Sequence, residues 1–184
     1  TDCDTRTLEA LSPTHHRCKT CGKEFIDDVR TNRDFLAIRH SEYVNDVATL
    51  ANAYQHSGDE RFARRAADIL LDYADKYAQI VSLEPRSTAS QAKINATTLN
   101  EAFILGSHRG TIYNSYHLIA AAPVLSADER RRIEYDFLLN SGTRMMRHGA
   151  EMNQRAEYFI CFGLAGLYTG RWALAGEAIY GDQG

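Results

Sequence analysis

Apolar residues recur at helical spacing over most of the chain and predict a succession of helices. In the first segment they lie three and four residues apart, as on the buried face of an amphipathic helix: Leu36, Tyr43, Val44, Val47, Leu50, Ala51 and Tyr54. A second segment has the same spacing: Phe62, Ala66, Ile69, Leu70, Tyr73 and Tyr77. Between them, Ser57 and Glu60 have the spacing of a capping box, which predicts that a helix starts here.

The middle of the chain continues the helical pattern after a long polar stretch. Residues 81–96 are predicted to form a loop, long for a compact domain and therefore a candidate for function. Thr98 and Glu101 again have capping-box spacing and predict a helix that ends before Pro123. Its apolar positions continue the helical spacing: Ile104, Tyr113, Tyr116 and Ile119.

Three further helices are predicted toward the end of the chain. Ser126 and Glu129 form the clearest start signal, and the helix that follows is expected to end near Gly149 as its C-cap. The last two helices are expected at about 152–169 and 171–180.

The first and last pairs of helices share a sequence pattern. Each copy has Leu-Ala-x-x-Tyr, then a glycine, then an aromatic residue followed by alanine; the glycines are Gly58 and Gly170. Each copy predicts two antiparallel helices joined by a tight turn, and stacked hairpins of this kind form a solenoid or a closed toroid. No strand pattern is evident. The predicted class is all-α, with residues 1–34 as an irregular segment and 35–184 as part of a helical domain.

Composition narrows the function classes. The 184 residues are 44% hydrophobic, enough for one sizeable core. A net charge of -3 gives no electrostatic footprint for nucleic acid, and no apolar window approaches the length of a membrane span. The chain opens on Thr1 without an initiator methionine or a signal peptide, so it is expected to be an internal piece of a longer protein.

The N-terminal segment carries a candidate metal site. Cys18 and Cys21 form a CxxC knuckle followed by glycine, which is half of a structural zinc site. Cys3 with His15 or His16 would complete a four-ligand set, and so would a second knuckle that precedes the chain. The alternative is a reduced or disulfide-linked pair without metal. A thioredoxin-type redox motif is disfavoured because no βαβ pattern surrounds it.

A second candidate site lies at the start of the helix predicted at 152–169. Asn153 and Gln154 open a helix whose body is almost wholly apolar, and His148 lies just before it. Such a helix is expected to be buried, so its polar end should face a cleft. Asn153 either caps the helix or helps to bind an anionic group, which a helix N-terminus favours.

Aromatic and imidazole side chains could line the same cleft. Tyr113 and His117 are one helical turn apart, and Tyr158 is one turn beyond Gln154. Tyrosine and histidine together suit sugar binding, because an apolar ring stacks on the sugar while a polar tip takes a hydroxyl. Tyr113, His117 and Tyr158 are therefore candidate substrate-binding residues, although histidines on helices are more often surface or half-buried structural residues.

The order and spacing of these motifs resemble the catalytic toroid of bacterial heparinase II/III-like polysaccharide lyases. The resemblance covers nearly the whole chain, through individually degenerate segments: the 18–22 knuckle, 50–74, 98–134 and 148–181. It implies an incomplete (α/α) toroid, followed in the complete protein by a β-rich domain. It also implies an acidic polysaccharide substrate, no organic cofactor, and a secreted or periplasmic enzyme, although the chain shows no targeting segment.

The resemblance also assigns roles to residues. Enzymes of this family cleave uronic-acid polysaccharides by β-elimination, and an Asn near a helix start neutralises the uronate carboxylate; Asn153 matches its position. Related alginate lyases have a His directly after that Asn, where this chain has Gln154, and His148 is a substitute. Glu101 either binds sugar hydroxyls or caps its helix. The catalytic Tyr would lie beyond Gly184, so the piece alone should be inactive.

Two other functions stay open. An (α/α) toroid glycoside hydrolase would need two carboxylates across a cleft, for which Glu101 and Glu151 are the candidates near predicted helix starts. A non-catalytic helical module would instead bind a protein or a glycan.

Overall fold

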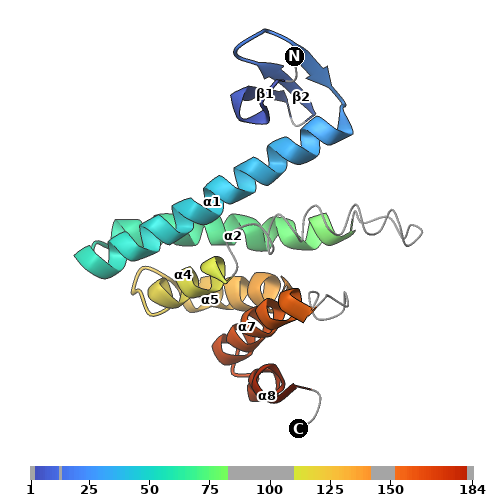
Figure 1. The fold of residues 1–184 in the computed structure, drawn as a ribbon. Helices are drawn as coiled ribbons and strands as arrows, with labels where there is room; N and C mark the ends of the chain where they lie inside the picture. The colour runs from blue at the N-terminus through green and yellow to red at the C-terminus, as the bar shows by residue number, and fades with distance from the viewer. Residues whose placement is uncertain (1–2, 13, 83–109, 142–151, 182–184) are drawn as a thin grey trace.

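A computed structural model describes residues 3–12, 14–82, 110–141 and 152–181. The helices and their bounds are α1 Val29–Ser57, α2 Glu60–Ser82, α4 Thr111–Ile119, α5 Ala127–Arg131, α7 Met152–Tyr168 and α8 Trp172–Tyr180. A 3-10 turn, η1, spans Thr5–Thr7, and a π-helical segment, η2, spans Arg132–Leu139. Figure 1 places the N-terminus at one end of the molecule and α8 at the other.

The described chain is mostly helical, broadly consistent with the predicted all-α class, but its N-terminal segment contains a small antiparallel sheet that the sequence pattern did not predict. Its strands, in the order β1-β2-β3, are Leu8–Ser12, His15–Cys18 and Glu24–Ile26. Helix α1 then begins at Val29, because the Asp28 carboxylate caps it by accepting a hydrogen bond from the Thr31 backbone N–H at 2.7 Å. The predicted domain boundary after residue 34 therefore lies inside α1.

The rest of the described chain is helical, as predicted, and both predicted hairpins are present. α1 packs against α2, and α7 packs against α8. The turns contain Gly58 and Gly170, each with φ 68°, a left-handed conformation that glycine adopts without a Cβ penalty. The Gly58 N–H also donates to the carbonyl oxygen of Tyr54 at 2.8 Å and so ends α1.

The helix starts agree with the sequence in one case and differ in another. Ser126 and Glu129 form the predicted capping box of α5, with side-chain to backbone distances of 3.2 and 2.9 Å. Ser57 and Glu60 do not form one. Asp59 caps α2 instead, because its carboxylate accepts a hydrogen bond from the Arg61 backbone N–H at 3.0 Å, while Ser57 is the last residue of α1.

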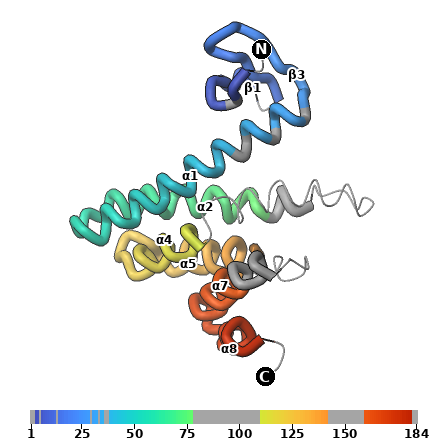
Figure 2. Tube along the Cα trace, in the orientation of Figure 1, coloured from blue at the N-terminus to red at the C-terminus, as the bar shows by residue number. Residues whose placement is uncertain are grey.

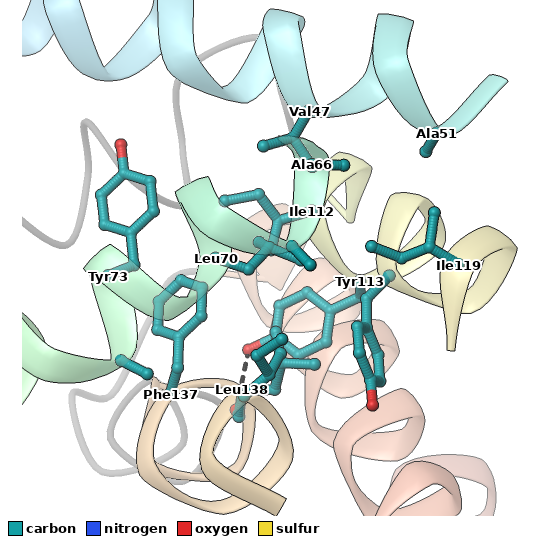
Figure 3. Packing of buried hydrophobic residues seen from close by; sticks show 14 of the residues in the cluster. Val47, Ala51, Ala66, Leu70, Tyr73, Ile112, Tyr113, Ile119, Phe137 and Leu138 are labelled. Carbon is teal, nitrogen blue, oxygen red and sulfur yellow. Dashed lines mark hydrogen bonds between the residues drawn. The ribbon is translucent and has the colours of Figure 1, made fainter. Parts of the chain in front are cut away.

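The main hydrophobic core lies between α1, α2, α4 and η2, with a contribution from α7 (Figure 3). Residues of this core that Figure 3 labels include Val47, Ala51, Ala66, Leu70, Ile112, Ile119, Phe137 and Leu138. A second, smaller cluster lies under the sheet and consists of Leu8, Cys18 and Phe35. Phe35 belongs to α1, so this one helix contributes to both clusters. Figure 2 shows α1 running from the sheet to the helical part of the molecule.

None of the helices in the described ranges has the length and apolar character needed to span a bilayer.

Candidate metal centre

A tight turn after strand β2 brings two cysteines together. The Gly22 N–H donates to the Cys18 carbonyl at 2.9 Å, and the Cys18 N–H donates to the Lys23 carbonyl at 2.9 Å. Gly22 has φ 73°, which a residue with a Cβ would adopt only with strain. The CxxC-Gly segment thus folds as a closed knuckle with Cys18 and Cys21 on one turn.

Cys3, which precedes β1, joins this knuckle at the same end of the sheet, where Leu8 pairs with Cys18. Its Sγ atom lies 3.0 Å from that of Cys21, and the three Sγ atoms of Cys3, Cys18 and Cys21 lie within 4.8 Å of one another. A disulfide would need about 2.05 Å, so the thiols are reduced. Thiolates on one tetrahedral zinc ion lie about 3.8 Å apart, given Zn–S bonds of about 2.3 Å. The three cysteines are therefore close enough to bind one metal ion.

The surroundings favour a thiolate at one of these positions. A hydrogen bond with the Thr7 hydroxyl, at 3.3 Å, and backbone amides of Cys21 and Thr20 lower the pKa of Cys18 to about 6. The hydrogen bond to Cys21, together with burial, raises the pKa of Cys3 to about 12. Since metals bind thiolates, the lowered pKa of Cys18 favours its role as a metal ligand.

The sequence offered two histidines, His15 and His16, as possible metal ligands. His16 is the one that lies beside the knuckle, against the small cluster under the sheet. Its side chain is 1% exposed, and its ring lies 4.4 Å from that of Phe35. His15 faces the other side of β2, where its Nε2 atom lies 3.1 Å from a carboxylate oxygen of Glu24. Strand alternation, with Cys18 two residues after His16, is the sequence signal that could have separated these two histidines.

The predicted carbohydrate site is described only in part. α7 begins at Met152, so the backbone of Asn153 and Gln154 lies in its first turn, as predicted. The side chains of Asn153, Gln154 and Tyr158 lie outside what the structure describes. Glu101 and His148 fall outside the described residues altogether.

Tyr113, which the sequence placed among the candidate substrate-binding residues, is buried in the main core. Its side chain is 5% exposed, and its hydroxyl donates to the Leu138 carbonyl at 3.1 Å and lies 2.7 Å from the Ser141 hydroxyl (Figure 3). Burial holds the pKa of Tyr113 well above its usual range, so the phenol stays neutral. Its structural role is to fasten α4 to η2.

His117, in contrast, is exposed at the last turn of α4. Its ring lies 6.0 Å from that of Tyr168 in a stacked arrangement, which links α4 to the end of α7. Tyr168 in turn donates a hydrogen bond to the Tyr113 carbonyl at 3.0 Å. His117 therefore keeps a solvent-facing position, whereas the tyrosine one turn earlier belongs to the core.

The structure also pairs two residues that sequence reasoning did not connect. His40 of α1 and Tyr73 of α2 share a hydrogen bond of 2.9 Å between Nδ1 and the phenolic oxygen. Tyr73 stacks on Phe137 of η2 at 5.5 Å, so the pair sits at the edge of the main core. Only the packing of three separate elements brings these side chains together.

Comparisons of the chain with models of protein families, with curated proteins and with solved structures find no match.

Proposed function

We propose that this chain is the helical scaffold of a polysaccharide lyase that cleaves a uronic-acid polysaccharide by β-elimination. The observation that carries the proposal is the repeated helical hairpin. The two segments with the shared sequence pattern, α1–α2 and α7–α8, both fold as antiparallel pairs around a left-handed glycine. Stacked hairpins are the building unit of an (α/α) toroid, the fold that the resemblance to heparinase II/III-like lyases implies.

Asn153 is the residue on which the proposed chemistry depends. Its backbone lies in the first turn of α7, where free N–H groups and the helix dipole favour a negatively charged group. In β-elimination the proton at C5 of the uronate is removed while charge spreads onto the adjacent carboxylate. An amide that donates a hydrogen bond to this carboxylate stabilises the transition state more than the ground state.

Replacing Asn153 with alanine tests this role. In the protein that carries this chain, we expect Asn153→Ala to lower kcat by about 100-fold or more with a much smaller change in KM, because the interaction strengthens in the transition state. Ultraviolet absorbance of the unsaturated uronate product measures the rate. Asn52→Ala on the exposed face of α1 is the matched control, since its amide bonds only to the Ala48 carbonyl.

The same assay separates the other functions. Hydrolysis of the polysaccharide without ultraviolet absorbance would favour a glycoside hydrolase that uses Glu101 and Glu151. Binding of the glycan without turnover, unchanged in Asn153→Ala, would favour a non-catalytic module. Wild-type kinetics in Asn153→Ala would contradict the role given to the amide.

We further propose that Cys3, Cys18 and Cys21 bind a structural zinc ion. The supporting observation is the group of three sulfur atoms within 4.8 Å, held by the knuckle and by η1. Zinc is the metal that thiolate-rich tetrahedral sites favour, and it needs no redox partner. The ion would tie the segment before β1 to the turn after β2 at one end of the sheet, where Leu8 pairs with Cys18. Among the described residues, the buried apolar members of the cluster under this sheet are Leu8, Cys18 and Phe35.

Metal content tests the zinc proposal. We expect the purified chain to hold about one equivalent of zinc, and Cys18→Ser to lose it, because the site needs that thiolate. Cys161→Ser is the control, since Cys161 is buried in the main helical core rather than in the knuckle. Zinc content that is unchanged in Cys18→Ser would overturn the assignment.

A further inference from the structure

The inner face of strand β2 presents two side chains that can bind a metal. His16 and Cys18 are buried, whereas the alternate residues of the strand, His15 and Arg17, point outward. Because side chains alternate along a strand, His16 and Cys18 share one face, with Cα atoms about 6.8 Å apart. An imidazole and a thiolate at this spacing can reach a single ion.

The imidazole of His16 is buried without hydrogen-bond partners among the described residues. Its side chain is 1% exposed, and among the described residues neither Nδ1 nor Nε2 has a hydrogen-bond partner. Its closest ring neighbour is the apolar side chain of Phe35, at 4.4 Å. A neutral imidazole always carries one donor and one acceptor, and leaving such a group buried without a partner costs about 1–3 kcal/mol.

The three thiols lack a fourth ligand for a tetrahedral metal site. A closed tetrahedral zinc site needs four protein ligands, and three cysteines with one histidine is a common set. His15 is a poor fourth ligand because it lies on the outer face and pairs with Glu24. His16 lies on the same face as Cys18, although its nitrogens are not part of the group of ligand atoms within 4.8 Å, so its ring has to turn toward Cys18.

We infer that His16 provides the fourth ligand of the metal ion held by the three cysteines. The inference rests on the proposed zinc site and deepens it. A ring nitrogen of His16 would bind the ion, and the second nitrogen would carry the ring's proton. One ion would thus complete the thiolate set and give one nitrogen of the buried imidazole a partner.

Nuclear magnetic resonance of the zinc titration tests this directly. With histidine side chains labelled with nitrogen-15, we expect zinc to shift the resonance of one ring nitrogen of His16. The other six histidines are internal controls. His16→Gln serves to assign the resonance. Because this measurement uses the wild-type chain, it remains decisive even if the variant does not fold.

Zinc affinity in two neighbouring variants gives an independent readout. By competition with a chelating dye, His16→Gln should bind zinc about 100-fold or more weakly, since even residues behind the ligands change affinity 10–100-fold. His15→Gln should stay within about threefold. Zinc binding by all three thiols with an unshifted His16 ring and unchanged affinity in His16→Gln would overturn the inference. A wild-type chain that binds no zinc would instead overturn the proposed site itself.

Discussion

At the residue scale, similar side chains have opposite roles because of small differences in position. Tyr113 and His117 are one turn apart on α4, yet the tyrosine is buried with a bonded hydroxyl and the histidine is exposed. Helical spacing alone could not separate them, since an aromatic ring with a polar tip suits both a core and a groove. Tyr113 can be buried because η2 offers its hydroxyl an acceptor, the carbonyl of Leu138.

The pair of His40 and Tyr73 predicts a dependence of stability on pH. Burial lowers the pKa of His40 below its ordinary value of 6.5. Between the two pKa values the unfolded chain binds more protons than the folded one, so stability is full above pH 6.5 and falls as the pH drops below it. We expect the thermal midpoint to decrease between about pH 7.5 and pH 5.5.

His40→Gln should lose part of this pH dependence, because glutamine does not titrate there. His56→Gln is the matched control: His56 lies on the same helix but is exposed, and it bonds to the Asn52 carbonyl. Thermal unfolding of the wild-type and both variants at each pH measures the effect. Equal slopes in all three proteins would show that His40 is not the responsible group.

At the element scale, the helical hairpins could be predicted and the strands could not. Apolar spacing of three and four residues, together with the turn glycines, identified α1, α2, α7 and α8. The strands β1, β2 and β3 are five residues or fewer, and their inner face carries His16 and Cys18 rather than an apolar alternation. The buried face of β2 thus carries an imidazole and a thiol, which a hydrophobic pattern does not reveal.

The hairpin of α7 and α8 depends on a close approach at Gly166. A Cβ atom at this position would lie 2.9 Å from the Ala175 backbone nitrogen and 2.9 Å from the Leu174 Cβ. We expect Gly166→Ala to lower the free energy of unfolding by about 1–3 kcal/mol, because α8 would have to move away from α7. Denaturant unfolding followed by circular dichroism measures it.

Gly176→Ala in α8 is the matched control for this substitution. Nothing lies within 4 Å of a Cβ atom built there, so alanine should be neutral or should stabilise the helix by up to about 1 kcal/mol. If both variants lost the same stability, the cause would be a general intolerance of this hairpin and not the contact with Ala175.

At the scale of the whole molecule, the buried apolar residues form two separate clusters, one under the sheet and one among the helices. The sheet packs on Phe35 near the start of α1, and the main core begins at Val44. Among the described residues, the sheet cluster has three buried apolar members against twenty-two in the main core, so the proposed zinc ion would contribute more to the stability of the sheet than to that of the helices. The candidate carbohydrate site and the metal centre therefore belong to different parts of the fold.

Removing zinc should consequently affect the two parts unequally. We expect a chelator to abolish the protection of β2 amides from hydrogen exchange while most of the helical circular dichroism remains. The amides of α2 are the internal reference, since this helix lies in the main core. Loss of both signals at the same chelator concentration would show that the sheet and the helices unfold as one unit.

Helix α1 connects the sheet to the rest of the molecule as a single long rod. Its 29 residues make a rod about 43 Å long, with the sheet at one end and the hairpin turn at Gly58 at the other. The part of α1 between Val44, where the main core begins, and Val29 is about 22 Å long, so a tilt of about 5° at the core moves the sheet end by about 2 Å. A fluorophore or spin label on the sheet would thus magnify small rearrangements among the helices into displacements large enough to measure.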